Sequence, residues 1–246
     1  MLKVMSDLHL EFMTRSYLPF SLSSQAEYLF CAGDIGDYSS KLFKLFFETA
    51  SKEYKQVFYV TGNHEYYGHE YSIVNSKIDE MLPDNCHRLD KNRSYTIDLG
   101  DREYNVVGCT LWTDVSFSAS LKMNDTRRIF DKTKKVTVDT IKKWNREDIS
   151  WLREWFSTPS HTKTTIVMTH HLPSYELIHP SFADEGDNSG FANDGLDDVI
   201  AKAKLWLFGH THRHIDKVIN GTRCYVNPRG YPDEVSGYNR DGLVSL

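Results

Sequence analysis

The sequence predicts an α/β fold in which parallel strands alternate with crossover helices. Five short apolar runs have the length and composition of buried parallel strands. Helical patterns lie between the early runs, and every run ends in a polar cluster containing Asp, Asn or His. Ligands of open α/β sheets bind beyond the carboxyl ends of such strands, so the clusters predict one shared metal site. In chain order the clusters are Asp7-Leu8-His9, Gly33-Asp34-Ile35-Gly36-Asp37, Gly62-Asn63-His64-Glu65, His170-His171 and Gly209-His210-Thr211-His212.

The first third of the chain alternates strand and helix signals. Residues 39–54 place Leu42, Phe46 and Ala50 at helical spacing, which predicts an amphipathic helix. Residues 69–82 form a second, weaker helical pattern that ends before a proline. A strand–helix–strand succession requires parallel strands joined by crossover helices.

Beyond the second helix the pattern changes to short strands. We expect strands at Arg93–Leu99, Glu103–Cys109 and Val115–Leu121, with a hairpin turn at Asp98-Leu99-Gly100-Asp101 between the first two. Residues 122–136 are basic and polar, and the sequence assigns them no regular structure.

Residues 137–157 carry the clearest helical pattern, with Ile141 and Leu152 on one face. Either Thr137 or Asp139 is expected to cap the start of this helix. Residues 172–198 are rich in turn residues, which predicts a lid or binding element, or else a disordered insertion.

The C-terminal part of the chain predicts a closing set of strands, with Asn220-Gly221 as a hairpin turn. These strands are expected at Ile215–Ile219, Thr222–Val226 and Leu243–Leu246. The sequence contains no internal repeat and no low-complexity segment. We therefore predict a single domain, residues 1–246.

Composition disfavours several classes of protein. The chain has 246 residues, 40% of them hydrophobic, and no apolar run reaches the length of a membrane span. The formal charge of −5 disfavours a broad nucleic-acid surface, which is normally basic. The four cysteines are widely spaced without a CxxC pair, which predicts buried free thiols and a cytoplasmic protein. The first apolar run begins at the start of the sequence, so we expect no signal peptide.

The donor types in the clusters predict the class of metal and of reaction. Asp, Asn and His without Cys favour Mn, Fe or Zn over a thiolate-bound metal. Two divalent ions roughly 3.5–4 Å apart that share an Asp and a hydroxide form a clamp for in-line attack on phosphorus. The positive charge of the two ions exceeds the negative charge of two aspartates and a hydroxide. The site would therefore keep a net positive charge that attracts a phosphate ester. Metal coordination also brings the pKa of the attacking water to roughly 7.

Taken in order, the five clusters resemble the calcineurin-like metallophosphoesterase superfamily over residues 5–212. The resemblance implies a four-layer α/β sandwich, with two central mixed β-sheets flanked by helices. It also implies two divalent metal ions. The first would be held by Asp7, His9 and His212, and the second by Asn63, His170 and His210, with Asp34 as the bridge between them.

The resemblance also implies an acid group. His64 matches the family's histidine that is not a metal ligand and that protonates the leaving oxygen or stabilises the transition state. Asp37 matches the acid that orients this histidine.

The chain departs from one branch of the superfamily directly after Asp37. Ser/Thr protein phosphatases follow that acid with Arg-Gly, whose Arg binds phosphate, whereas this chain has Tyr38 and Ser39. The departure points to the broader bacterial-type branch. Three further stretches look like an incompletely characterised group within it: Thr110–Trp112, Met123–Ile129 and Asn227–Tyr231.

The sequence therefore predicts hydrolysis of a small phosphate ester by a metal-bridging hydroxide, without a covalent enzyme intermediate. A phosphodiester is favoured because the phosphate-gripping Arg is missing, and a phosphomonoesterase is the alternative. A nuclease is disfavoured by the acidic charge. A non-catalytic metal-binding scaffold is the rival outside enzymes, but such a chain should lack a ligand or the acid histidine, and this one retains every position. The physiological substrate and the oligomeric state stay open.

Several residues beside the motifs have two interpretations. Tyr66 and Tyr67 either line the entrance of the site or pack against the next helix. Glu65 and His171 are expected to support the ligands or to pack, because their neighbours already point to the site. Four arginines either contact the phosphate of the substrate or are solvated charges: Arg127, Arg128, Arg213 and Arg229.

Overall fold

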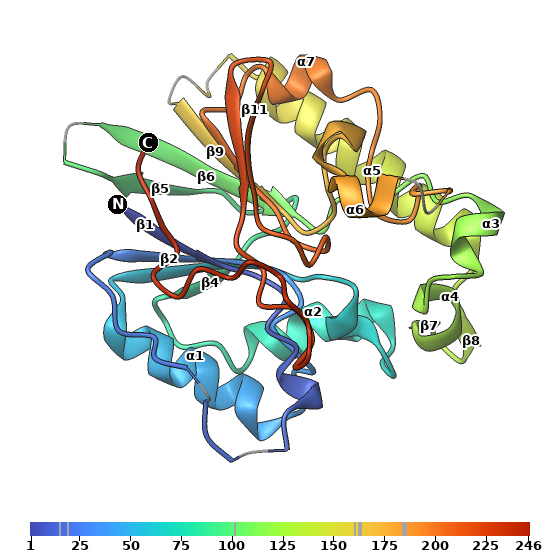
Figure 1. The fold of residues 1–246 in the computed structure, drawn as a ribbon, viewed down its shortest axis with the longest axis horizontal. Coiled ribbons are helices and arrows are strands. Elements are labelled where there is room, and N and C mark those ends of the chain that lie inside the picture. Colours follow the sequence, from blue (N-terminus) through green and yellow to red (C-terminus); the bar gives the residue numbers. More distant parts are fainter. Residues whose placement is uncertain (15, 19, 101, 160, 162–163, 184–185) are drawn as a thin grey trace.

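Two large β-sheets pack against each other in the described part of the chain, with helices on both outer sides (Figure 1). The computed structural model describes residues 1–246 except 15, 19, 101, 160, 162–163 and 184–185. The first sheet has the strand order β13-β1-β2-β3-β4. Its strands are β1 (Leu2–Met5), β2 (Tyr28–Ala32), β3 (Gln56–Val60), β4 (Cys86–Arg88) and β13 (Leu243–Val244).

The second sheet has the strand order β11-β12-β10-β9-β6-β5. Neighbouring strands are parallel in both sheets except for β13, β5 and β11, which lie at sheet edges and run antiparallel to their partners. Both sheets are therefore mixed, as predicted. The strands of the second sheet are β5 (Tyr95–Asp98), β6 (Glu103–Cys109), β9 (Thr164–Thr169), β10 (Leu205–Leu207), β11 (Ile215–Ile219) and β12 (Thr222–Val226).

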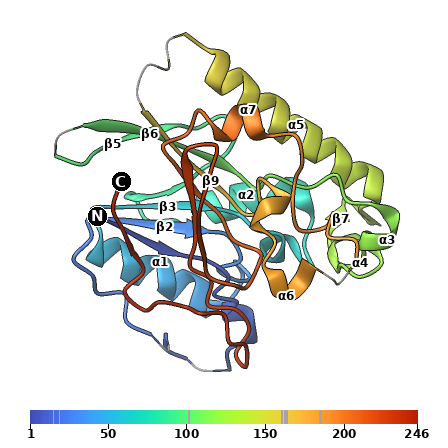
Figure 2. The ribbon, with the colours of Figure 1, turned by 45° about the horizontal axis from the view of Figure 1, so that its top comes forward.

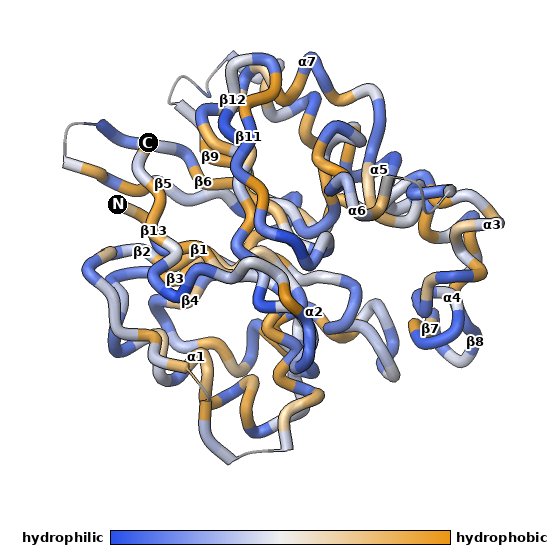
Figure 3. Tube along the Cα trace, viewed as in Figure 1, coloured by the Kyte–Doolittle hydropathy of each residue, from blue (hydrophilic) through white to orange (hydrophobic). Residues whose placement is uncertain are grey.

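Helices cover the outer face of each sheet (Figures 1 and 2). α1 (Lys41–Glu53) and α2 (Tyr71–Asp79) pack on the first sheet, and α5 (Val138–Ser157) and α7 (Asp197–Ile200) pack on the second. One hydrophobic cluster fills each sheet–helix interface, and a third lies between the sheets. The hydrophobic segments of the central strands lie in this interior (Figure 3). The predicted four-layer α/β sandwich is confirmed.

The long helices begin at residues that satisfy their free backbone N–H groups. The Ser40 hydroxyl accepts a hydrogen bond from the Phe43 N–H at 3.1 Å at the start of α1. Thr137 starts α5 and exchanges hydrogen bonds with Thr140, so Thr137 is the cap of the two candidates. The three helices predicted from periodicity are confirmed, with ends that differ from the prediction by up to three residues.

The strand predicted at Val115–Leu121 is wrong. This segment contains the short helix α3 (Phe117–Ser120), because the Ser116 hydroxyl accepts a hydrogen bond from the Ala119 N–H at 3.0 Å and so caps a helical turn. The stretch left unassigned, 122–136, contains α4 (Asp125–Arg128), β7 (Phe130–Asp131) and β8 (Lys134–Lys135). Within 172–198 the described residues form the 3₁₀ turn η3 (Tyr175–Leu177), α6 (Pro180–Ala183) and the start of α7.

The two predicted hairpins join antiparallel strands. Asn220 and Gly221 have φ angles of +50° and +83°, the left-handed values that a two-residue hairpin turn requires, and they connect β11 to β12. β5 and β6 also pair antiparallel, although Asp101 of the predicted turn lies outside the described residues. All four cysteines are buried free thiols, as predicted. Among the described residues, no helix has the length and apolar character needed to cross a membrane.

Candidate metal centre and active site

The carboxyl ends of five strands deliver the polar clusters to one place. Asp7 and His9 follow β1, and Asp34 follows β2. The remaining side chains of the centre are Asn63 and His64 after β3, His170 after β9, and His210 and His212 after β10. Three groups have possible ligand atoms within 4.8 Å of one another, and two of them consist of predicted ligands: Asp7, His9 and His212, and Asp34, His170 and His210. The structure thus brings together every residue predicted to bind metal.

The backbone at these positions is unusual. Left-handed φ angles between +48° and +68° occur at five of the predicted ligands, Asp7, His9, Asp34, His210 and His212. A left-handed residue other than glycine costs of order 1–3 kcal/mol, and such residues persist where the surrounding structure requires them. Here the tight turns aim alternate side chains of one short segment into the same site.

Glycines let the strand ends approach closely enough to form the site. A Cβ atom at Gly62 would lie 2.1 Å from Asp34 Oδ1, and one at Gly33 would lie 2.3 Å from His170 Nδ1. Gly33 also has a left-handed φ of +86°. The small residue at the end of these apolar runs is therefore required by the close packing of the ligands themselves.

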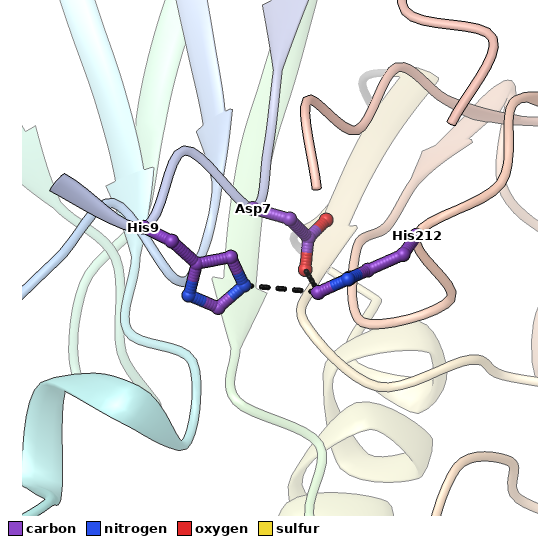
Figure 4. Close-up of side chains that lie close together, drawn as sticks. All are labelled: Asp7, His9 and His212. Atoms are coloured by element: carbon purple, nitrogen blue, oxygen red, sulfur yellow. Dashed lines mark hydrogen bonds and ion pairs between the residues drawn. The ribbon is translucent and has the colours of Figure 1, made fainter. Parts of the chain in front are cut away.

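The side chains of the first candidate group, Asp7, His9 and His212, lie close together (Figure 4). The Nε2 atoms of His9 and His212 lie only 2.9 Å apart, and Asp7 Oδ1 lies 3.5 Å from His212 Nε2. The other ring nitrogens donate to carboxylates: His9 Nδ1 to Glu11 at 3.1 Å and His212 Nδ1 to Glu234 at 2.6 Å. In the tautomer with hydrogen on both Nδ1 atoms, the two Nε2 lone pairs face each other, an arrangement that a shared metal ion would stabilise.

The second ligand group is more deeply buried. His170 Nδ1 donates to the Ala32 carbonyl at 2.9 Å, which leaves its Nε2 as the ligand atom. This Nε2 lies 3.1 Å from Asn63 Oδ1, 3.2 Å from His210 Nδ1 and 3.4 Å from Asp34 Oδ2. Asp34 Oδ2 also lies 3.8 Å from His9 Nε2, so this carboxylate reaches both groups.

Charge at the centre also fits a bound cation. Burial alone would raise the pKa of Asp34, but His170 and the neighbouring histidines hold it well below its usual range. Burial alone would lower the pKa of His170, but the Asp34 carboxylate raises it to about 9. Asp7 Oδ2 is buried and has no hydrogen-bond partner among the described residues. These anionic oxygens and ring nitrogens match the donors that divalent transition metals take.

Two buried acids hold the second group in position. Asn63 Nδ2 donates to Asp125 Oδ1 at 2.9 Å and to the Tyr67 hydroxyl at 2.7 Å, which turns Asn63 Oδ1 toward the site. Glu65 accepts hydrogen bonds from the N–H groups of Ile35 at 2.8 Å and Gly62 at 2.7 Å. Glu65 therefore braces the turns that carry the ligands, as its position beside them predicted.

The structure does not bring Asp37 to His64. His64 Nδ1 lies 2.8 Å from Glu11 Oε1, so Glu11 occupies the place expected for Asp37. Asp37 contacts His69 Nε2 at 3.0 Å instead. Burial would raise the pKa of Asp37, but hydrogen bonds from His69 and Ser39 lower it to about 2. The physical reason is the turn η1 (Leu10–Phe12), which places Glu11 beside the histidine.

His64, His9 and Glu11 form a third cluster that could hold a metal by distance alone. One oxygen of Glu11 lies near Nδ1 of both histidines, at 2.8 Å and 3.1 Å. We interpret this cluster as a hydrogen-bonded carboxylate shared by two imidazoles, because His9 Nε2 already faces the first ligand group. His64 Nε2 then faces the Tyr231 hydroxyl at 3.3 Å.

Sequence reasoning missed four supporting residues: Glu11, Asp125, Tyr231 and Glu234. Tyr231 lies within the stretch Asn227–Tyr231, whose Gly230 N–H donates to the Asp7 carbonyl at 2.9 Å. Burial raises the pKa of the Tyr231 hydroxyl, which therefore stays protonated at neutral pH. The family resemblance had singled out the stretches that contain Asp125 and Tyr231 without giving these residues a role, whereas no pattern pointed to Glu11 or Glu234.

A cavity of about 280 Å³ adjoins the centre. Its lining combines the metal-binding region with two loops that lie far apart in the sequence. The lining residues are Asp34, Asn63, His64, Tyr67, Lys122, Met123, Asn124, Ile178, Phe182, Asn188, Phe191, His210, Thr211, His212, Tyr231 and Glu234. A larger groove of about 930 Å³ lies along α5, away from these ligands.

Of the remaining residues that the sequence singled out, one lines the cavity and the others make packing or hydrogen-bond contacts elsewhere. Tyr67 lines the cavity, whereas Tyr66 is buried and packs on Tyr71. His171 is buried against the Thr110 carbonyl, and burial lowers its pKa to about 3. The four candidate arginines are absent from the cavity lining: Arg128 lies over the Tyr67 ring, Arg213 over Phe182, Arg229 over Phe20, and Arg127 donates to the Leu121 carbonyl.

Comparison with known proteins agrees with this geometry. The family model for calcineurin-like phosphoesterases matches residues 2–214. The chain belongs to this family. This calcineurin-like phosphoesterase is therefore a hydrolase of phosphoric ester bonds, and its candidate ligand groups accord with metal-dependent hydrolysis.

Three individual proteins are similar to this phosphoesterase. An uncharacterized protein of Acanthamoeba polyphaga mimivirus is 30% identical over 277 residues, with 100% of this chain and 96% of the viral protein covered. The phosphopantetheinyl hydrolase of Mycobacterium tuberculosis shares the fold at a TM-score of 0.71 and 16% identity, covering 96% of this chain and 93% of its own. A Staphylococcus aureus structure assigned as a 5′-nucleotidase has a TM-score of 0.56 and 16% identity, covering 93% of this chain and 48% of its own.

Proposed function

We propose that this phosphoesterase hydrolyses a small phosphodiester with the help of two divalent ions, Mn, Fe or Zn. The observation that carries the proposal is the position of Asp34, whose Oδ2 lies within 4 Å of ligand nitrogens in both groups, at 3.8 Å from His9 and 3.4 Å from His170. A carboxylate in this position can bridge two ions. Asp7, His9 and His212 would hold one ion, and Asn63, His170 and His210 the other.

The residues of the chain have separate roles in the proposed reaction. When bound, two divalent ions would polarise the phosphate and supply a hydroxide nucleophile near neutral pH. His64 donates a proton from Nε2 to the leaving oxygen, while Glu11 holds its Nδ1. The Tyr231 hydroxyl, 3.3 Å from His64 Nε2, donates a hydrogen bond to a phosphate oxygen. Asp37 has no part in this step because it faces His69.

The cavity favours a diester over a monoester. A monoester carries a second negative charge near neutral pH, and Lys122 is the one Lys or Arg in the lining among the described residues. Apolar rings also lie on both ligand groups: Phe12 contacts His9 with ring centroids 5.9 Å apart, and Phe191 contacts His210 at 5.0 Å. In the proposed site these two rings, one in the cavity lining and one outside it, would each contact one organic group of a diester.

A phosphomonoesterase is the second candidate. Lys122 in the lining favours it, because an ammonium group could balance the additional charge of a monoester. The two structural neighbours, assigned to a phosphopantetheinyl and a nucleotide substrate, are consistent with a small phosphorylated substrate for this chain as well.

Hydrolysis of bis-p-nitrophenyl phosphate beside p-nitrophenyl phosphate tests the proposal. The protein is stripped of metal and reloaded with manganese, and His64→Ala serves as the blank. His161→Ala is the matched control, because His161 stacks on Trp155 away from the site. We expect faster turnover of the diester that requires metal and His64. A preference for the monoester would instead establish a phosphatase, and activity on neither ester with two metals bound would contradict catalysis of this kind.

A further inference from the structure

Two loops that are distant in the sequence are fastened together beside the candidate metal centre. The Asp187 carboxylate accepts hydrogen bonds from the hydroxyl groups of Ser116 and Ser118. The Ser116 N–H donates to the Ser189 hydroxyl at 2.9 Å. Figures 1 and 2 show α3, α4 and α6 gathered on this side of the molecule. These bonds make the wall of the cavity a pre-formed surface.

Four apolar side chains lie on the inner surface of this wall, beside the polar Lys122, Asn124 and Asn188. Met123, Ile178, Phe182 and Phe191 line the cavity, and each is only partly exposed. The Arg213 guanidinium lies over the Phe182 ring, 5.2 Å from its centroid. A ring backed in this way is held in place and presents an aromatic surface to the cavity.

The same wall carries neutral amide groups. Asn124 and Asn188 both line the cavity, and Asn188 Nδ2 donates to the Phe182 carbonyl at 3.1 Å, which fixes its side chain beside the aromatic ring. Amide groups next to an aromatic surface match the hydrogen-bonding edges and flat faces of a heteroaromatic ring. A sugar phosphate alone would leave the apolar wall without a partner.

We infer that this cavity is a subsite for a planar heteroaromatic group of the substrate, such as the base of a nucleoside phosphate ester. The inference rests on the proposed function, which places the phosphate at the adjoining metal centre. The cavity of about 280 Å³ is near the lower limit of small-molecule sites and suits one such group. The wall of loops 112–136 and 172–198 thus selects the organic part of the substrate, while the strand ends bind the phosphate.

Binding measurements test the subsite without requiring turnover. Manganese-loaded His64→Ala protein is titrated by calorimetry with adenosine 5′-monophosphate, ribose 5-phosphate and hexyl phosphate. We expect adenosine 5′-monophosphate to bind about tenfold more tightly than either of the others, the range of stacking on one aromatic side chain. Adding Phe182→Ala should remove this preference. Adding Phe117→Ala instead should preserve the preference, because Phe117 lies on α3 and is 72% exposed.

Each other result overturns the inference. Equal affinity for adenosine 5′-monophosphate and ribose 5-phosphate would show that the base is not bound, and equal affinity for hexyl phosphate would show a general apolar pocket. A preference that survives Phe182→Ala would place the base elsewhere. Phe182→Leu retains apolar volume without the flat ring, so it should lose most of the preference even if Phe182→Ala fails to fold.

The two proposals fail in different ways. If wild-type protein hydrolyses neither nitrophenyl ester but still prefers adenosine 5′-monophosphate, the subsite stands and the proposed activity falls. If the diester is hydrolysed but the preference is missing, the activity stands and the subsite falls.

Discussion

The two groups of candidate metal ligands differ in what supports them. In the first group, His9 and His212 donate to the carboxylates of Glu11 and Glu234. In the second, His170 donates to a backbone carbonyl of β2 and has a fully buried side chain. The side chains of His212 and Glu234 are 13% and 36% exposed. His170 is therefore held by the sheet itself, whereas the two histidines of the first group depend on carboxylates carried by two loops.

The different hydrogen-bond partners of the histidines predict that the two groups respond differently to substitution. A carboxylate on the outer nitrogen of a metal-bound histidine raises the basicity of that ligand and fixes its tautomer. A backbone carbonyl fixes the tautomer but adds no charge. Substitutions at Glu11 and Glu234 should thus adjust the first group and leave the second unchanged, with Glu11 acting on His64 as well. Asp34, which reaches both groups, should affect the whole centre.

The largest effect is expected from Asp34→Asn. Removal of the shared negative charge should abolish binding at both groups, with bound metal falling from about two ions per chain to about none. Metal content measured by mass spectrometry checks this, with Asp37→Asn as a matched control three residues away. A fully loaded Asp34→Asn protein would sink the bridging role.

His64→Ala should come next in size. Loss of a positioned proton donor lowers turnover by roughly 10²–10⁴-fold. Metal content should stay near that of wild type, because His64 Nδ1 faces Glu11 and His64 Nε2 faces Tyr231. Loss of one or both metals in this variant would show instead that His64 is a ligand.

The contrast between strand ends and loops also explains how far the sequence alone could predict this site. The candidate ligands follow buried strands directly, so the apolar runs and the order of the clusters indicated them, and the family resemblance divided them into two groups. The partner of His64 depends on the turn η1 and the placement of Glu11, which local pattern does not encode. Asp125 and Phe182 lie on four-residue helices, whose formation depends on caps and tertiary contacts more than on periodicity.

A smaller effect is expected from Glu11→Gln. Glutamine retains an oxygen acceptor but loses the charge shared by His9 and His64, which should lower turnover by about 10–100-fold. The loss should be greater for an alkyl leaving group than for p-nitrophenol, because a poor leaving group depends more on the proton from His64. Asp37→Asn should leave both rates near wild type. A larger loss in Asp37→Asn than in Glu11→Gln would restore Asp37 as the orienting acid.

The smallest effect is expected from Glu234→Gln, which tests the comparison most directly. Glu234 Oε2 lies 2.6 Å from His212 Nδ1 and also accepts the Tyr231 N–H at 2.9 Å. Loss of its charge should weaken manganese binding at the first group by about tenfold, while the second group keeps its affinity. Titration with a chelator should then remove the two ions in two separate steps.

Glu154→Gln, an exposed substitution on α5, controls for the change in net charge. Wild-type protein and this control should release the first ion at a higher chelator concentration than Glu234→Gln. If Glu234→Gln weakens the binding of both ions equally, the two groups do not bind their ions independently. The shared Asp34 carboxylate would then couple them. A separate first step would instead show that the loop carrying Glu234 sets the affinity of one ion without changing that of the other.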